Sequence, residues 1–168
     1  MDLADICEDG KCVLALCIAE ITLKSIEEKN EDLDYCRKSV DLCWEWLEDR
    51  TISKWQICER ISNDNRAIAD IVLETEDINL ANKYGTILIC VSYTAWQAYN
   101  YEEDYCYPQD LECVDDEYLL NLINDLIKEK FILYNTYESL LRYIKGNYCI
   151  NDKKVTKRDI IGNLNNLY

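Results

Sequence analysis

Apolar residues recur at every third or fourth position along most of the chain, which is the spacing of one face of an α-helix. The pattern is clearest over residues 32–48, where one stripe is formed by Leu33, Cys36, Val40, Cys43, Trp44 and Leu47. Similar stripes predict long helices over 12–28, 79–101, 116–129 and 131–145, and shorter ones over 53–61 and 67–72.

Several helix ends carry their own signals. Ser53 followed by Gln56 has the spacing of a capping box, and the short helix behind it is predicted to bury Trp55, Cys58 and Ile61. Asp115 is expected to cap the helix over 116–129, and Thr156 a last short helix. Gly146-Asn147 is expected to end the helix over 131–145.

Turn-forming residues are scarce. Four Gly and one Pro occur in 168 residues, where average usage would give roughly twenty. The sequence therefore predicts an all-α fold, a single-domain bundle of six to eight helices over residues 1–168. The tail 151–168, which carries Lys153, Lys154, Lys157 and Arg158, is expected to pack loosely.

The net charge limits which partners are expected. With 18 Lys and Arg against 33 Asp and Glu, the net charge is −15. Such a chain repels nucleic acid and anionic membranes, so neither is an expected partner. The acidic start, MDLADICEDGK, is unlike the basic start of a signal peptide, which favours a cytoplasmic location. An acidic surface can attract a basic partner, or it can simply keep the protein soluble.

The residues needed for common chemistry are missing. There is no His, so neither a Ser-His nor a Cys-His pair can form within the chain. The ten cysteines contain no C-x-x-C pair, and Cys36 and Cys43 would lie about 10 Å apart on one helix. Most cysteines are therefore predicted to be small core residues in a reducing compartment. We expect no metal, no cofactor and no catalytic residues.

A run of acidic residues over 102–117 is the most distinctive feature. It contains no Lys or Arg, and its acids are Glu102, Glu103, Asp104, Asp110, Glu112, Asp115, Asp116 and Glu117. Tyrosines are interleaved with them, namely Tyr101, Tyr105, Tyr107 and Tyr118. Rings beside carboxylates are typical of a surface that binds a basic protein. The alternative is a solvated loop in which Asp115 and Asp116 favour the start of the next helix.

The tryptophans fall into two groups. Trp44 lies on the apolar stripe and is predicted to be in the core. Trp46 lies about 200° from that stripe, so it either meets another helix or is exposed for a partner. Trp96 fits either the core or a patch beside Tyr93.

Three strings resemble a known family. LCWEWLEDR at 42–50, YTAWQAY at 93–99 and PQDLECVDDE at 108–117 are similar to the sixth family of predicted immunity proteins from bacterial polymorphic toxin systems. The similarity covers about residues 10–145. It implies an all-α fold and neutralisation of a toxin domain by tight binding, without catalysis.

The working hypothesis is a cytoplasmic immunity protein, monomeric when unbound, whose partner is a cognate toxin domain. A basic nuclease is one candidate, because an acidic inhibitor can occupy a cleft that binds phosphate. The candidate partner-binding residues are Trp46, Trp96, Glu102, Glu103, Asp104, Tyr105, Tyr107, Asp110 and Glu112. The alternative is an acidic structural or adaptor subunit of a larger assembly. A neighbouring gene for a secreted toxin would favour the first hypothesis.

Overall fold

The fold is helical throughout residues 3–150 and 154–164, which are the residues that the structure, a computed structural model, describes. These residues contain no strand, and they form one compact domain, which confirms the predicted all-α class. The helices are α1 (Glu8–Lys24), α2 (Glu31–Asp49), α3 (Lys54–Ile61), α4 (Ile68–Glu74), α5 (Ile78–Tyr101), η1 (Gln109–Leu111), α6 (Asp116–Lys128), α7 (Tyr134–Ile144), η2 (Lys145–Cys149) and α8 (Lys157–Leu164).

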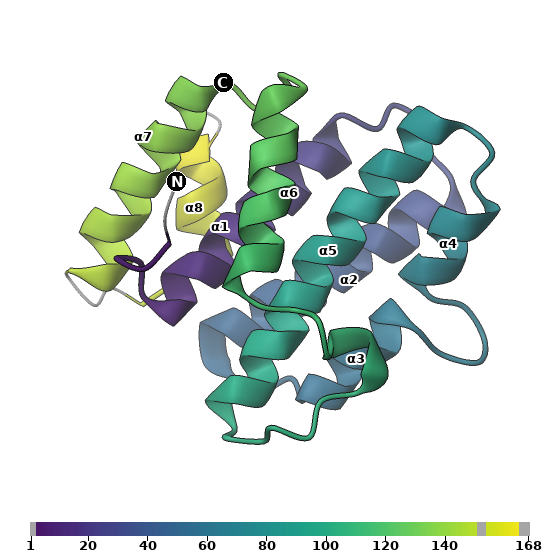
Figure 1. The fold of residues 1–168 in the computed structure, drawn as a ribbon, viewed down its shortest axis with the longest axis horizontal. Helices are drawn as coiled ribbons and strands as arrows, with labels where there is room; N and C mark the ends of the chain where they lie inside the picture. Colours follow the sequence, from purple (N-terminus) through teal and green to yellow (C-terminus); the bar gives the residue numbers. More distant parts are fainter. Residues whose placement is uncertain (1–2, 151–153, 165–168) are drawn as a thin grey trace.

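Helix α1 lies at the centre of the bundle, with α5 packed along it (Figure 1). The sequence pattern predicted one apolar face, but every residue from Gly10 to Glu20 is buried. A helix that is apolar on all sides must be covered on all sides. Helices α2, α5, α7 and α8 and the turn η2 provide that cover.

Helix α5 organises the other half of the molecule. Its 24 residues pack against α1 and α2 and also hold the short helices α3 and α4 (Figure 1). Asp77 caps its start by accepting a hydrogen bond of 2.8 Å from the backbone N–H of Leu80. Tyr84, Tyr93 and Tyr99 are fully buried along it. The acidic run begins where this helix ends.

Most predicted helix ends are present. Ser53 and Gln56 form the capping box, Asp115 accepts from the N–H of Tyr118 at 2.8 Å, and Thr156 accepts from the N–H of Asp159 at 3.3 Å. The predicted stop at Gly146-Asn147 is wrong. Gly146 does not adopt a positive φ, so it is no helix-ending residue, and the chain continues through the π-helical turn η2.

The inner face of α3 also differs from the prediction. Lys54, Ile57 and Ile61 are buried, whereas Trp55 is exposed and Cys58 only half-buried. The buried stripe is therefore set by Ile57 and Ile61, and the predicted stripe of Trp55 and Cys58 lies about 100° to one side of it. Trp55 is consequently a surface residue beside the acidic run.

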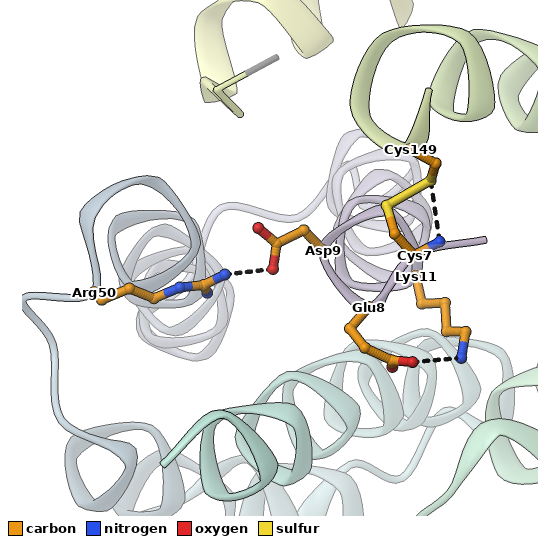
Figure 2. The surroundings of a disulfide bond; sticks show 6 residues. All are labelled: Cys7, Glu8, Asp9, Lys11, Arg50 and Cys149. Atoms are coloured by element: carbon orange, nitrogen blue, oxygen red, sulfur yellow. Dashed lines mark hydrogen bonds and ion pairs between the residues drawn. A yellow bond between two sulfur atoms is a disulfide. The ribbon is translucent and has the colours of Figure 1, made fainter. Parts of the chain in front are cut away.

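The cysteine prediction holds for half of the ten residues. Cys12, Cys17, Cys36, Cys43 and Cys90 are buried as small core side chains, but Cys106 and Cys113 are exposed. Cys7 and Cys149 form a disulfide across 142 residues, with their Cα atoms 5.3 Å apart. Figure 2 shows Cys149, at the end of η2, reaching Cys7 just ahead of α1. This bond joins the start of α1 to the end of η2.

A buried carboxylate fastens α8 to the centre. Glu20 of α1 is 3% exposed and accepts a hydrogen bond of 3.1 Å from the indole N–H of Trp44. The ammonium of Lys157 in α8 lies 2.9 Å from the same carboxylate and also donates to Asp41. Burial opposes the charged form of Lys157, but the hydrogen bonds to Asp41 and Glu20 outweigh it and raise the pKa. The described part of the basic tail is therefore packed, with Ile160 fully buried.

Replacing Glu20 by Ala is expected to lower the free energy of unfolding by about 1–3 kcal/mol, because the buried indole N–H of Trp44 then has no acceptor. The Trp44 indole and the Lys157 ammonium would both lose an acceptor. Urea unfolding followed by circular dichroism measures the change. The double variant E20A/K157M should recover part of the lost free energy of unfolding. An E20A variant as stable as the parent would contradict this account.

Candidate functional site

Residues 102–117, named here the acidic loop, connect α5 to α6. The loop leaves the end of α5, passes α3 through the turn η1 and returns to the start of α6 (Figure 1). Leu111 in η1 and Val114 are buried and anchor it to the core. The loop is therefore an ordered surface element that lies against α3.

Lys54 of α3 neutralises two of its carboxylates. Its ammonium lies 2.6 Å from Asp104 and 2.8 Å from Glu102, and 4.7 Å from the centre of the Tyr99 ring. Hydrogen bonds to Asp104 and Glu102 raise the pKa of Lys54, and Lys54 in turn lowers the pKa of Asp104. The loop itself contains no base, but Lys54, which is 50 positions from Asp104 in the sequence, compensates part of its charge.

Three further acids of the loop have hydrogen-bond partners within the protein. Asp110 accepts a hydrogen bond from the Ser62 hydroxyl, and Asp115 caps α6. Asp116 accepts from the Tyr93 hydroxyl at 2.7 Å and from the Lys11 ammonium at 2.6 Å. Asp115 therefore stabilises the start of α6, and Asp116 ties that start to α5 and α1.

The remaining carboxylates face solvent. Within residues 3–150 and 154–164, those of Glu103, Glu112 and Glu117 make neither a hydrogen bond nor an ion pair, and all three are exposed. Tyr105 of the loop is 68% exposed, and Tyr101, the last residue of α5, is 61% exposed. The loop and the end of α5 thus combine unneutralised charge with accessible rings.

Glu103 also ends helix α5. Its φ of 54° places it in the left-handed region, and the N–H of Asp104 donates to the carbonyl of Tyr99 at 3.0 Å. This is a Schellman ending in a position where glycine is usual. Lys130 ends α6 with the same pair of hydrogen bonds, whereas Arg50, which also has a positive φ, ends α2 with a single bond from its N–H to the carbonyl of Trp46.

The other candidate aromatics are less accessible. Tyr107 is half-buried, packs 5.9 Å from Tyr99 and donates a hydrogen bond of 2.5 Å to Asn100. Trp96 is half-buried, with its ring 5.6 Å from that of Tyr93. Both rings are therefore less accessible to a partner than those of Tyr101 and Tyr105.

Trp46 does not lie on the surface. It is 2% exposed, the Arg50 guanidinium lies 3.9 Å above its ring, and Tyr101 of α5 meets it edge-on at 6.2 Å. Of the two alternatives for Trp46, the structure shows the contact with another helix. Asp9 of α1 pairs with the same Arg50, as Figure 2 shows. We therefore leave Trp46 out of the interaction surface, because its ring is not accessible to a partner.

Sequence reasoning missed Trp55 and Glu59 of α3. Trp55 is 57% exposed, with its ring edge-on to Tyr99 at 5.5 Å, and Glu59 lies one turn further along α3. The signal that could have found them is the pair Ile57 and Ile61, which fixes the buried stripe of α3 and leaves Trp55 outside it.

The surface thus consists of exposed carboxylates and aromatic rings on the acidic loop and α3. Within the described ranges, no three acidic or cysteine side chains are arranged to hold a metal ion. A family model described as Immunity protein Imm6 matches residues 10–129. The chain belongs to the Imm6 family of immunity proteins. Family membership implies a toxin as the partner.

The Imm6 match has a clear extent in the structure. It covers nearly all of α1 and continues to the end of α6, so the acidic loop and α3 lie inside it. Helices α7 and α8, the turn η2, and both Cys7 and Cys149 lie outside it. No curated protein and no solved structure matches the chain. None of the described helices combines the length and apolarity needed to cross a membrane.

Proposed function

We propose that this Imm6 protein neutralises a cognate toxin by binding it through the acidic loop and the neighbouring face of α3, without catalysis. The observation that carries the proposal is the exposed set of Glu103, Glu112, Tyr101, Tyr105 and Trp55 on adjoining elements. Rings supply contact area, and carboxylates orient a basic partner.

The charge of the whole chain supports the same partner. A net charge of −15 attracts a basic surface at long range and repels polynucleotides. The toxin face that fits is therefore positively charged, as in a nuclease whose cleft binds phosphate. We further propose that the free protein is a monomer and acts in the cytoplasm, where it would meet an incoming toxin.

The test removes charge only where the fold does not need it. Changing Glu103→Gln, Asp110→Asn and Glu112→Gln should weaken toxin binding and leave the urea unfolding curve unchanged. Glu102 and Asp104 are left intact, because their loss would strand the buried Lys54 ammonium. The matched control removes three exposed carboxylates elsewhere, through Glu27→Gln, Glu28→Gln and Glu74→Gln.

Two measurements decide the outcome. One is survival of bacteria that express the toxin domain encoded beside this gene, together with each variant. The other is the dissociation constant for that domain at two salt concentrations. The triple variant should protect less and lose much of the salt dependence, while the control behaves as the parent. A parent protein that neither binds nor protects would refute the function. Full protection by the triple variant would refute only the choice of surface.

A further inference from the structure

A recess of about 220 Å³ lies between α3 and the turn η1, within the proposed binding surface. Its lining consists of Trp55, Cys58, Glu59, Ile61, Ser62, Pro108, Asp110 and Leu111. Small-molecule sites usually measure about 300–1,000 Å³. The recess is smaller than that and has the size suited to a single side chain.

The α3 wall is a single stripe. Trp55, Glu59 and Ser62 follow one another at spacings of four and three, so they lie one above the other on the helix surface. Trp55 offers an exposed ring at one end. Ile61 and Leu111 are buried and provide an apolar floor, with half-buried Pro108 opposite α3.

The rim carries two carboxylates and no base. Asp110 uses one oxygen for the Ser62 hydroxyl, while Glu59 makes no side-chain hydrogen bond or ion pair within the described parts of the chain. The two bases of α3 have other partners. The Lys54 ammonium lies 5.9 Å from the centre of the Trp55 ring but is neutralised by Glu102 and Asp104, and the Arg60 guanidinium lies 4.9 Å from the centre of the Tyr35 ring.

An apolar floor, an exposed indole and two carboxylates fit a side chain that has an aliphatic stem and a cationic end. That end must be planar to stack on Trp55. A guanidinium stacks on aromatic rings and binds carboxylates through two parallel hydrogen bonds, whereas an ammonium does neither as well. We infer that the recess is a receptor for one arginine side chain of the toxin. The toxin as its source rests on the proposed function.

The arginine itself can be tested without the toxin. Amide-capped arginine, amide-capped lysine and amide-capped citrulline are titrated separately, and the indole N–H signal of Trp55 is followed by NMR after assignment with W55F. Arginine should give a saturable shift with a millimolar dissociation constant, lysine a weaker one, and uncharged citrulline none. The double variant E59Q/D110N, whose amides keep the shape of the rim, should abolish the arginine response. No response to arginine, or an equal response to citrulline, would overturn the inference.

The second arm uses the toxin domain. E59Q/D110N should raise its dissociation constant at least about tenfold, which corresponds to 1.4 kcal/mol. The charge-matched control, E27Q/E28Q, should bind as the parent. Unchanged affinity of E59Q/D110N would overturn the inference while leaving the proposed function intact. If the parent did not bind the toxin at all, the function and the source of the arginine would both be wrong. A dimer of the parent that E59Q/D110N dissociates would assign the recess to a second copy, and overturn the toxin as its occupant.

Discussion

Raising the pH from about 9 to 11 is expected to unfold this protein. Cys12, Cys17, Cys36, Cys43 and Cys90 are fully buried. Burial raises the pKa of each of these thiols well above its ordinary value of 9.0. The native state therefore keeps five protons that the unfolded chain releases in this range.

Proton linkage gives the direction and the size of the change in stability with pH. Stability falls with rising pH wherever the unfolded state binds fewer protons than the native state. Each thiol that is ionised only after unfolding contributes about 1.4 kcal/mol per pH unit, so five contribute about 7 kcal/mol per unit. Small domains have a total stability of about 5–15 kcal/mol. Burial also raises the pKa of Tyr93 above its ordinary value of 10.0, which adds to the loss above about pH 10.

Urea unfolding at a series of pH values, with oxygen excluded, measures this slope. C17A and C90A each remove one buried thiol. Each should therefore reduce the slope by about 1.4 kcal/mol per pH unit, whatever the stability of the variant at neutral pH. C113A removes an exposed thiol and is the control. Slopes that do not change in C17A and C90A would show that these thiols are not the cause.

The predictions from sequence succeeded where the information is local. Ser53 and Gln56 are three residues apart, as are Asp115 and Tyr118, and the spacing alone indicates the hydrogen bonds that start α3 and α6. The helix periods likewise report which side of a helix is apolar. They located the long helices and the buried Trp44.

The predictions failed where two distant segments decide the outcome. Lys54 and Asp104 are 50 residues apart, and nothing in either neighbourhood indicates that they pair. The position of Trp46 depends on Tyr101 and Arg50, which come from two different helix ends. Gly146 has the sequence of a helix stop, but packing of Tyr148 against the core favours one further turn. Tertiary contacts override local preference at each of these positions.

These long-range contacts change the interpretation of the acidic run. As a sequence it contains eight acids without a base, whereas in the structure it contains structural and exposed carboxylates side by side. Asp104 and Asp116 bind lysines of α3 and α1, and Glu103 and Glu112 do not. Mutations that treat the run as one surface would therefore mix loss of stability with loss of binding.

Reduction of the Cys7–Cys149 disulfide is expected to lower the free energy of unfolding by about 2–5 kcal/mol and leave the native fold in place. The bond closes a loop over a separation of 142 residues, and cross-links over such long loops restrict the unfolded chain strongly. The native contact does not depend on the bond alone. A Cβ at Gly10 would lie 2.9 Å from both the Cys149 sulfur and a methyl carbon of Ile144, so α1 and η2 already pack as closely as a glycine allows.

Urea unfolding with and without reductant measures this effect. The double variant C7S/C149S should have the free energy of unfolding of the reduced parent, and adding reductant should not change it. Circular dichroism of the reduced protein without urea should equal that of the oxidised protein. Reduction should also leave toxin binding unchanged, because both cysteines lie outside the residues that the Imm6 model matches. The cytoplasmic action proposed above requires this independence, because the cytoplasm is reducing. Loss of binding on reduction, in a protein that remains folded, would mean that the surface around α3 depends on the disulfide.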